Sequence, residues 1–255
     1  GGALNETIKS AINTLTQRSS SLTSLISAIS YPILVIVMAC AVIIYLDNSV
    51  FVQFRLIKPI EEWPQSGRDL VNVASIIQTW WWLVVFGIVA LIVGLRITMN
   101  NYTGEFRPLL DKFPPFSLYR RFAAARLMET LGLLVANGVV FKNAIKIMQY
   151  QSTPYVGYHL MMMEHLLSTG KGNIADVMST GLIDDADIIR MRVMAEVKGF
   201  EHGLIRMGIR GSEQSTKTLR LISRILGGLL LTIGALLIIL IVRGIYLTGM
   251  AMGSL

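Results

Sequence analysis

Three long stretches without a charged residue constrain the fold of this chain more than any other feature. They cover 19–46, 70–95 and 225–242. A helix of about 20 mostly apolar residues can cross the ~30 Å hydrocarbon core of a bilayer. Three such helices are hard to bury in one soluble protein of 255 residues, of which only 15% are charged. Together with a mean hydropathy of +0.58, these stretches predict three membrane spans.

The Lys and Arg residues beside these stretches predict the orientation of the chain, because positively charged flanks stay in the cytoplasm. Arg96 follows the second stretch, and Lys217 and Arg220 precede the third. The triple Trp80–Trp82 fits an interfacial belt better than a core. The predicted domains are the C-terminal tail of a first cytoplasmic helical domain (1–25), the first span (26–46), a periplasmic loop (47–79), the second span (80–96), a second cytoplasmic helical domain (97–221), the third span (222–247) and a periplasmic tail (248–255).

The region between the second and third spans has the pattern of helices. Its apolar residues recur at helical spacing, as at Leu127, Leu131 and Leu134, and no stretch alternates as a strand would. Gly138 suits the end of the helix that contains these leucines, and Thr153-Pro154 marks a later break. We therefore expect an all-α membrane protein, with three transmembrane helices and a cytoplasmic bundle of about six helices.

A short repeat links the two ends of the chain. Leu25-Ile26-Ser27 recurs as Leu221-Ile222-Ser223, and each tripeptide leads into an uncharged stretch. The shared order of polar helix, tripeptide and span favours an internal duplication. The sequence also begins at Gly1 without a methionine. We therefore expect 1–25 to be the end of an earlier cytoplasmic domain equivalent to the one between the second and third spans.

The residues that could carry chemistry do not form a catalytic pattern. His159 and His165 lie six residues apart, which does not place two metal ligands on one helix face. The glycine turn 169–173 lacks the GxxxxGK[ST] pattern of a phosphate-binding loop. The acids of 184–187 precede a helix, whose N-terminus they stabilise; a cation site is the alternative. We predict a protein that is not an enzyme and has no catalytic, cofactor or metal site.

The basic residues of the predicted cytoplasmic domain offer one candidate binding surface. The pI of 9.7 does not predict a nucleic-acid partner, because the basic residues are scattered and no aromatic residues are interleaved with them. The densest cluster is Arg120, Arg121 and Arg126. It is either a solvated helix face or a docking surface for an acidic partner. Lys142 and Lys146 lie one turn apart on the polar side of the next helix.

Glycines in the third span offer a second candidate surface, because a residue without a side chain lets another helix approach closely. The contact could be with a second copy of the chain or with the helix of a partner. The outer end of this span carries Arg243, which we expect to extend its side chain toward the interface. The four candidate positions are Gly227, Gly228, Gly234 and Gly244.

Four motifs resemble, in their order along the chain, those of the inner-membrane platform proteins of type IV pilus and type II secretion machines. They are YPILV (31–35), ARLMETLGLLVANGVVFKNAI (125–145), AEVKGF (195–200) and GIYL (244–247). The family has two homologous helical cytoplasmic domains, which agrees with the organisation predicted above. The motif residues that the resemblance carries over are Tyr31, Pro32, Gly138, Glu196 and Gly199.

This sequence also departs from the family pattern. Ala195 stands where the family usually has a glycine before Glu196, and Gly227-Gly228 stands where the second repeat often has Glu-Pro. Thr248 stands where a proline often follows Tyr-Leu. These departures suggest a divergent branch, either type IVb-like or from a conjugative-plasmid pilus system.

The resemblance implies a homo-oligomeric, multi-pass platform in the bacterial inner membrane, with its N-terminal tail and 97–221 in the cytoplasm. Such a platform couples a cytoplasmic hexameric ATPase to the insertion of pilin or pseudopilin subunits into a filament, and it contacts other inner-membrane assembly proteins and the lipid bilayer. Docking of the ATPase would then involve the basic residues of the two helices named above. The alternative is a transporter or channel subunit. The spans argue against it, because they contain almost no ionisable groups that could line a transport path.

Overall fold

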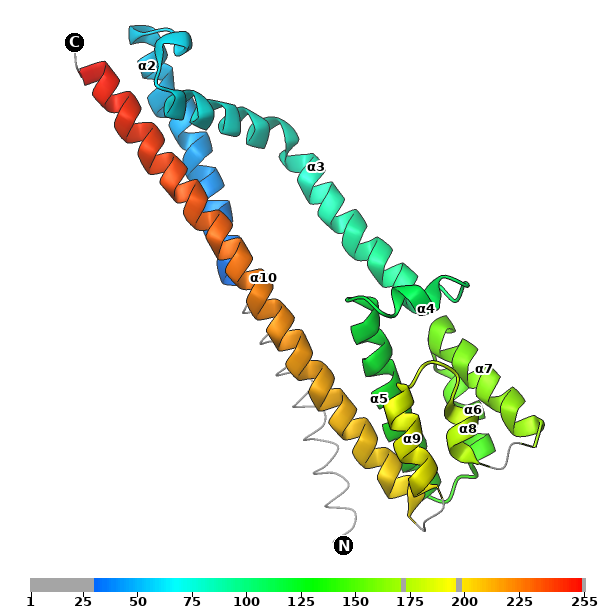
Figure 1. Cartoon of the computed structure of the whole chain (residues 1–255). Coiled ribbons are helices and arrows are strands. Elements are labelled where there is room, and N and C mark those ends of the chain that lie inside the picture. Colours follow the sequence, from blue (N-terminus) through cyan, green and yellow to red (C-terminus); the bar gives the residue numbers. More distant parts are fainter. Residues whose placement is uncertain (1–29, 171–172, 196–198, 254–255) are drawn as a thin grey trace, which may run out of the picture. The chain divides into compact units, whose positions relative to one another are not determined.

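The computed structural model describes residues 30–170, 173–195 and 199–253. All regular structure in these ranges is helical (Figure 1). The chain divides into two compact units. The first joins the residues up to Val89 with those from Arg220 onward, and the second is Ala90–Leu219. The predicted all-α class is thereby confirmed.

Three helices are long and apolar enough to cross a membrane, as the sequence predicts. They are Ser30–Ile57, α3 (Gln65–Asn101) and α10 (Phe200–Gly253). Their most apolar windows have mean hydropathies of 2.3, 2.3 and 3.0, and each window is largely exposed on the chain. Exposed apolar side chains along the full length of a helix suit contact with lipid better than contact with water.

Much of the predicted loop 47–79 is helical. The helical stretch that begins at Ser30 continues through a π-helical turn, η1 (Leu46–Val50), into α2 (Phe51–Ile57). A short 3-10 turn, η2 (Ile60–Glu62), follows, and α3 begins at Gln65, well before the triple tryptophan. These are helix bounds, and the positions at which the helices enter and leave lipid remain predictions.

The core of the first unit lies where these segments meet α10. Figure 1 shows the C-terminal part of α10 running beside the helix that starts at Ser30. The Trp63 ring packs edge-on against Phe51 with centroids 5.4 Å apart, and its Nε1 donates a hydrogen bond of 2.9 Å to the Lys58 carbonyl. The buried residues of this core are Ala39, Ile43, Leu46, Phe51, Trp63, Leu70, Ala74 and Ile241.

The second unit is a set of short helices around one apolar core. They are α4 (Arg107–Leu110), α5 (Phe116–Ala136), α6 (Phe141–Tyr150), α7 (Pro154–Ser168), α8 (Ile174–Met178) and α9 (Asp185–Met194), together with the beginning of α10. The core includes Leu127, Met128, Leu131, Ile145, Leu160, Met163 and Met191, all at most 2% exposed. Apolar side chains from α5, α6, α7 and α9 thus bury one another.

Two glycines set the geometry inside this unit. Gly138 has φ of +84°, and its N–H donates a 2.9 Å bond to the Val135 carbonyl, so that α5 ends there as its sequence predicts. Gly208 of α10 lies against the backbone of α5. A Cβ on Gly208 would approach the Ala125 carbonyl oxygen and the Glu129 nitrogen to 2.6 Å. The two helices therefore cross with their backbones in contact.

Candidate functional site

The arginine cluster of α5 is bound in part within the second unit. Arg120 pairs with the Asp184 carboxylate and donates to the Gly181 carbonyl at 3.2 Å. The Arg121 Nε lies 3.5 Å from the same carboxylate. Asp184 is the N-cap residue of α9, but its side chain makes no capping hydrogen bond. Asp184 therefore links α5 to the start of α9, and Arg126, the third member of the cluster, is exposed.

The two lysines of α6 lie on its exposed side. The Lys146 Nζ is 3.5 Å from Glu164 of α7, and Gln149 donates a 3.0 Å hydrogen bond to the other Glu164 oxygen. The bond from Gln149, together with the positive charge of Lys146, lowers the pKa of the Glu164 carboxyl. Lys142 is exposed one turn earlier. A positive face thus extends along α6, and ATPase docking on it remains a prediction.

The glycines of the third span have different surroundings. Gly234 packs against the first apolar helix, with a Cβ position 3.0 Å from Val35. Gly244 packs against α3, with a Cβ position 2.8 Å from Leu70. Gly227 is buried, whereas no described atom lies within 4 Å of a Cβ built on Gly228. Two of the four positions therefore serve packing inside the first unit, and Gly228 faces outward.

An open groove of about 610 Å³ lies beside Gly228. Pro32 and Tyr31 of the YPILV motif contribute to one side of it, and Arg220 and Arg224 contribute charge. The helix Ser30–Ile57 therefore places its motif beside the glycine pair of α10. Whether Pro32 bends a longer helix depends on residues before Ser30, which lie outside the described part of the chain.

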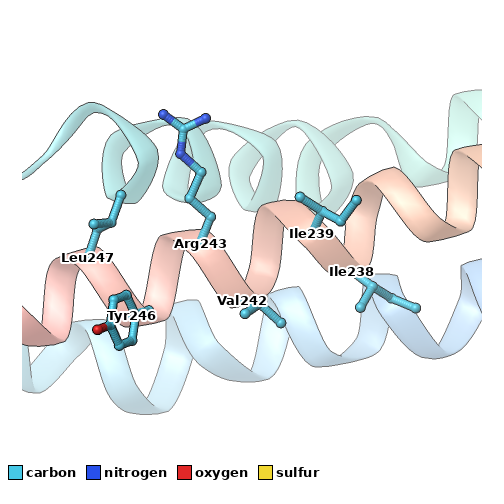
Figure 2. Close-up of a pocket in the computed structure, with 6 residues that line it drawn as sticks. All are labelled: Ile238, Ile239, Val242, Arg243, Tyr246 and Leu247. Carbon is cyan, nitrogen blue, oxygen red and sulfur yellow. The ribbon is translucent and has the colours of Figure 1, made fainter.

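A second, shallow pocket of about 390 Å³ lies further along α10. Figure 2 shows Arg243 pointing to the opposite side of α10 from Val242 and Tyr246. The remaining lining residues are Ile238, Ile239 and Leu247. All except Arg243 present carbon surface, apart from the Tyr246 hydroxyl, so this pocket offers an apolar contact surface with one cation at its edge.

One buried and extensively hydrogen-bonded group of the second unit was not predicted from the sequence. Arg107 is buried, and its Nε donates to Asp111 at 2.9 Å. Its other nitrogens donate to the carbonyls of Thr98 and Met99 in α3, at 2.9 and 3.2 Å. The guanidinium carbon also lies 3.9 Å from the centroid of the Tyr155 ring. Arg107 therefore fastens the end of α3 to the helical core.

Tyr155 closes this network from α7. Its hydroxyl donates a 2.8 Å hydrogen bond to the second Asp111 oxygen. Burial, followed by this bond and the Asp111 charge, raises the pKa of the Tyr155 hydroxyl. The hydroxyl therefore stays protonated and serves as a donor. The spacing of Arg107 and Asp111, four residues apart, was the only local signal of this cluster; Tyr155 is 44 residues further along the chain.

His159 is a buried structural histidine. Its Nδ1 lies 3.1 Å from both the carbonyl oxygen and the hydroxyl of Thr180. Burial lowers the pKa of His159 to about 4, so the ring is neutral at pH 7. Among the described residues, no three His, Cys, Asp or Glu side chains are grouped as metal ligands would be.

The AEVKGF motif is only partly described. Glu196 lies outside the described residues. Gly199 has φ of +95° and accepts hydrogen bonds from the N–H groups of His202 and Gly203. A backbone in this region favours glycine, and here it leads directly into α10. The role of Glu196 remains a prediction.

Comparison with known proteins finds two relatives. The chain is 25% identical to toxin coregulated pilus biosynthesis protein E of Vibrio cholerae over 223 residues, which are 87% of this chain and 65% of that protein. It is 28% identical to type II secretion system protein F of Xanthomonas campestris pv. campestris over 155 residues, which are 58% of this chain and 38% of that protein.

The chain thus spans less than two thirds of the length of either relative. No protein-family model matches it, and no solved structure matches it. One relative is named for pilus biosynthesis and the other for type II secretion, the two machines to which the sequence motifs pointed. The chain is therefore homologous to a pilus biosynthesis protein and to a type II secretion F protein, which supports the family resemblance of its motifs.

Proposed function

We propose that this protein is an inner-membrane platform of a type IV pilus or type II secretion assembly machine. The observation that carries the proposal is the similarity to a pilus biosynthesis protein over 87% of the chain. The three apolar helices support it, because they suit a multi-pass membrane protein. The helical unit between the second and third of them supports it too, since it offers a body to which a cytoplasmic partner can bind.

In this proposal the second unit faces the cytoplasm, and both 47–79 and the C-terminal tail face the periplasm. The basic residues on both sides of that unit, Arg96 and Arg220 among them, favour this orientation. Reporter fusions in 47–79 and in the α6–α7 region test it directly. Reporters on the same side of the membrane would contradict it.

A hexameric ATPase would supply the energy, since the printed sequence contains no phosphate-binding loop motif. Because Arg120 and Arg121 are bound to Asp184 and Lys146 is bound to Glu164, we place the docking charge on Arg126 and Lys142. Charge complementarity governs the association rate and the choice of partner more than the total affinity. Binding of an ATPase through an acidic surface should therefore depend on these residues.

The test is co-purification of the ATPase with full-length platform protein from membranes. The variant R126E/K142E should recover severalfold less ATPase than the wild type. The variant R190E is the control, because Arg190 is exposed on α9 and pairs with Asp187 next to it. Equal recovery with R126E/K142E and wild type would remove these residues from the docking surface.

Pilin or pseudopilin would contact the outward-facing Gly228 and the groove beside it. A photo-crosslinking residue at Leu231, which lines the groove, should capture pilin or a second copy of the platform. The same residue at Val84, exposed on α3, serves as the control for random collisions in the membrane. Equal yields at the two positions would argue against a pilin site at the groove.

A further inference from the structure

In residues 102–113, here called the interfacial segment, Arg107 and Asp111 are turned inward, whereas three large apolar side chains are turned outward. The segment also exposes Glu105 and Lys112. Arg107 and Asp111 keep 4% and 7% of their accessible surface. Phe106, Leu109 and Phe113 keep 70%, 58% and 64%. A segment that faces water has the opposite arrangement, because burying a charge costs free energy and burying apolar surface gains it.

Single exposed apolar residues are ordinary on protein surfaces. Here three large ones follow one another within eight residues, and Pro108 and Pro114 are exposed beside them. Such a patch marks a surface that another apolar phase covers. The buried Arg107–Asp111 pair on the inner side shows that this orientation is held by specific bonds.

The position of the patch is fixed relative to the end of α3. Arg107 donates hydrogen bonds to the carbonyls of Thr98, Met99 and Tyr102, at 2.9, 3.2 and 3.2 Å. These carbonyls belong to the last turn of α3 and the residue that follows it. Phe106, the neighbour of Arg107 in the chain, therefore lies close to the point where α3 ends.

If the triple tryptophan marks one boundary of the membrane, the end of α3 lies at the depth of the opposite boundary. The rise from Trp80 to Asn101 in a continuous helix is about 32 Å at ~1.5 Å per residue, close to the ~30 Å of the hydrocarbon core. Residues directly after Asn101 then lie among lipid headgroups. Lys112 is exposed between Leu109 and Phe113, which suits the anionic lipids of a cytoplasmic leaflet.

We propose that the interfacial segment lies in the headgroup layer of the cytoplasmic leaflet, with Phe106, Leu109 and Phe113 inserted toward the acyl chains. The proposal rests on the orientation given under the proposed function, in which α3 crosses the membrane toward the cytoplasmic second unit. Lipid is the occupant we favour because the patch continues directly from a membrane helix. The segment then binds the second unit to the bilayer surface at the start of α5.

Spin labels measure this directly, because oxygen collides more often with a label in lipid and a water-soluble nickel chelate collides more often with a label in water. Cys40 is the one cysteine of the 255 residues, so C40A removes it from the background. Single cysteines replace Leu109 and Phe113 in the full chain, reconstituted in nanodiscs of phosphatidylethanolamine and phosphatidylglycerol. Leu91, exposed on α3, is the lipid control, and Tyr150, exposed on α6, is the aqueous control.

We expect the labels at 109 and 113 to favour oxygen, as at 91, and the label at 150 to favour nickel. Nickel-favoured labels at 109 and 113 with an oxygen-favoured label at 91 would overturn the inference while leaving the membrane span intact. A nickel-favoured label at 91 would overturn the span itself and the inference with it. Labels at 109 and 113 shielded from both reagents would assign the patch to a protein contact, and so would also overturn the proposal.

Discussion

Removing the Arg107 side chain should destabilise the second unit more than any other single loss of charge in it. Arg107 and Asp111 are 5% and 8% exposed at their side chains and 2.9 Å apart. In R107M, the Asp111 carboxylate stays buried without its cation and keeps the hydrogen bond from the Tyr155 hydroxyl. Breaking a buried ion pair in this way costs about 3–5 kcal/mol.

Native-state hydrogen exchange of the full chain in detergent micelles measures this loss locally. At about 1.4 kcal/mol for each tenfold change, amides of the core helices α5 and α7 should exchange about 10²–10⁴-fold faster in R107M. The matched control is R190M, which breaks an Arg–Asp pair that is 71% and 31% exposed. That pair should contribute at most about 1 kcal/mol.

The double variant R107M/D111L separates a lost attraction from an isolated charge. It removes both buried charges, so its amides should exchange more slowly than those of R107M, although it has lost more hydrogen bonds. The reasoning would be refuted if R107M exchanged no faster than R190M. It would also be refuted if the stability lost in R107M/D111L equalled the sum of the stabilities lost in R107M and in D111L.

Three other substitutions test separate features. G208A should lower the free energy of unfolding by about 1–3 kcal/mol, because its Cβ meets the α5 backbone at 2.6 Å. G228A has open space around it and should instead raise the free energy of unfolding by up to about 1 kcal/mol through helix propensity. Equal thermal stabilities of the two variants would contradict this. His159 has a pKa lowered from 6.5 to about 4, so the unfolded chain binds its proton first and stability falls as the pH drops from 6.5 toward 4. Between pH 7 and 5 the wild type should lose about 2 kcal/mol more than H159Q in chemical denaturation, and parallel pH profiles would exclude this role. D184N should weaken the contact of α5 with α9 by no more than about 1 kcal/mol, because both partners are partly exposed; a much larger loss in exchange protection would show that the pair is structurally central.

The fold class and the positions of the helices follow from local features of the sequence. Uncharged stretches predicted the three apolar helices, and Gly138 and Thr153-Pro154 predicted where helices end and begin. These signals are local, because helix period, missing charge and backbone restriction all act within a few residues. The extent of α3 was predicted less well. Its first turns precede the triple tryptophan, and Gly67 there packs closely against Thr248 of α10, a contact that local sequence does not encode.

The candidate site was predicted only in part, because side-chain partners depend on tertiary packing. The sequence singled out Arg120 for its positive neighbours, but its carboxylate partner, Asp184, is 64 residues away. It treated the four glycines of the third span alike, although Gly234 meets the first apolar helix and Gly228 meets nothing described within 4 Å. Arg107 was not predicted as part of a site, since a single arginine before Pro108 has no sequence pattern of its own.

The close crossing of α5 and α10 has a mechanical consequence. At most helix contacts, interleaved side chains can change rotamer and let one helix slide past the other. Gly208 and Gly132 contribute no side chain of their own, and a Cβ on Gly132 would lie 2.8 Å from the Glu201 carbonyl oxygen and 2.7 Å from the Ile205 side chain. The backbones of α5 and α10 are in close contact at two places. We therefore expect the two helices to resist sliding along each other. We expect a displacement of α5 to move the N-terminal part of α10 with it.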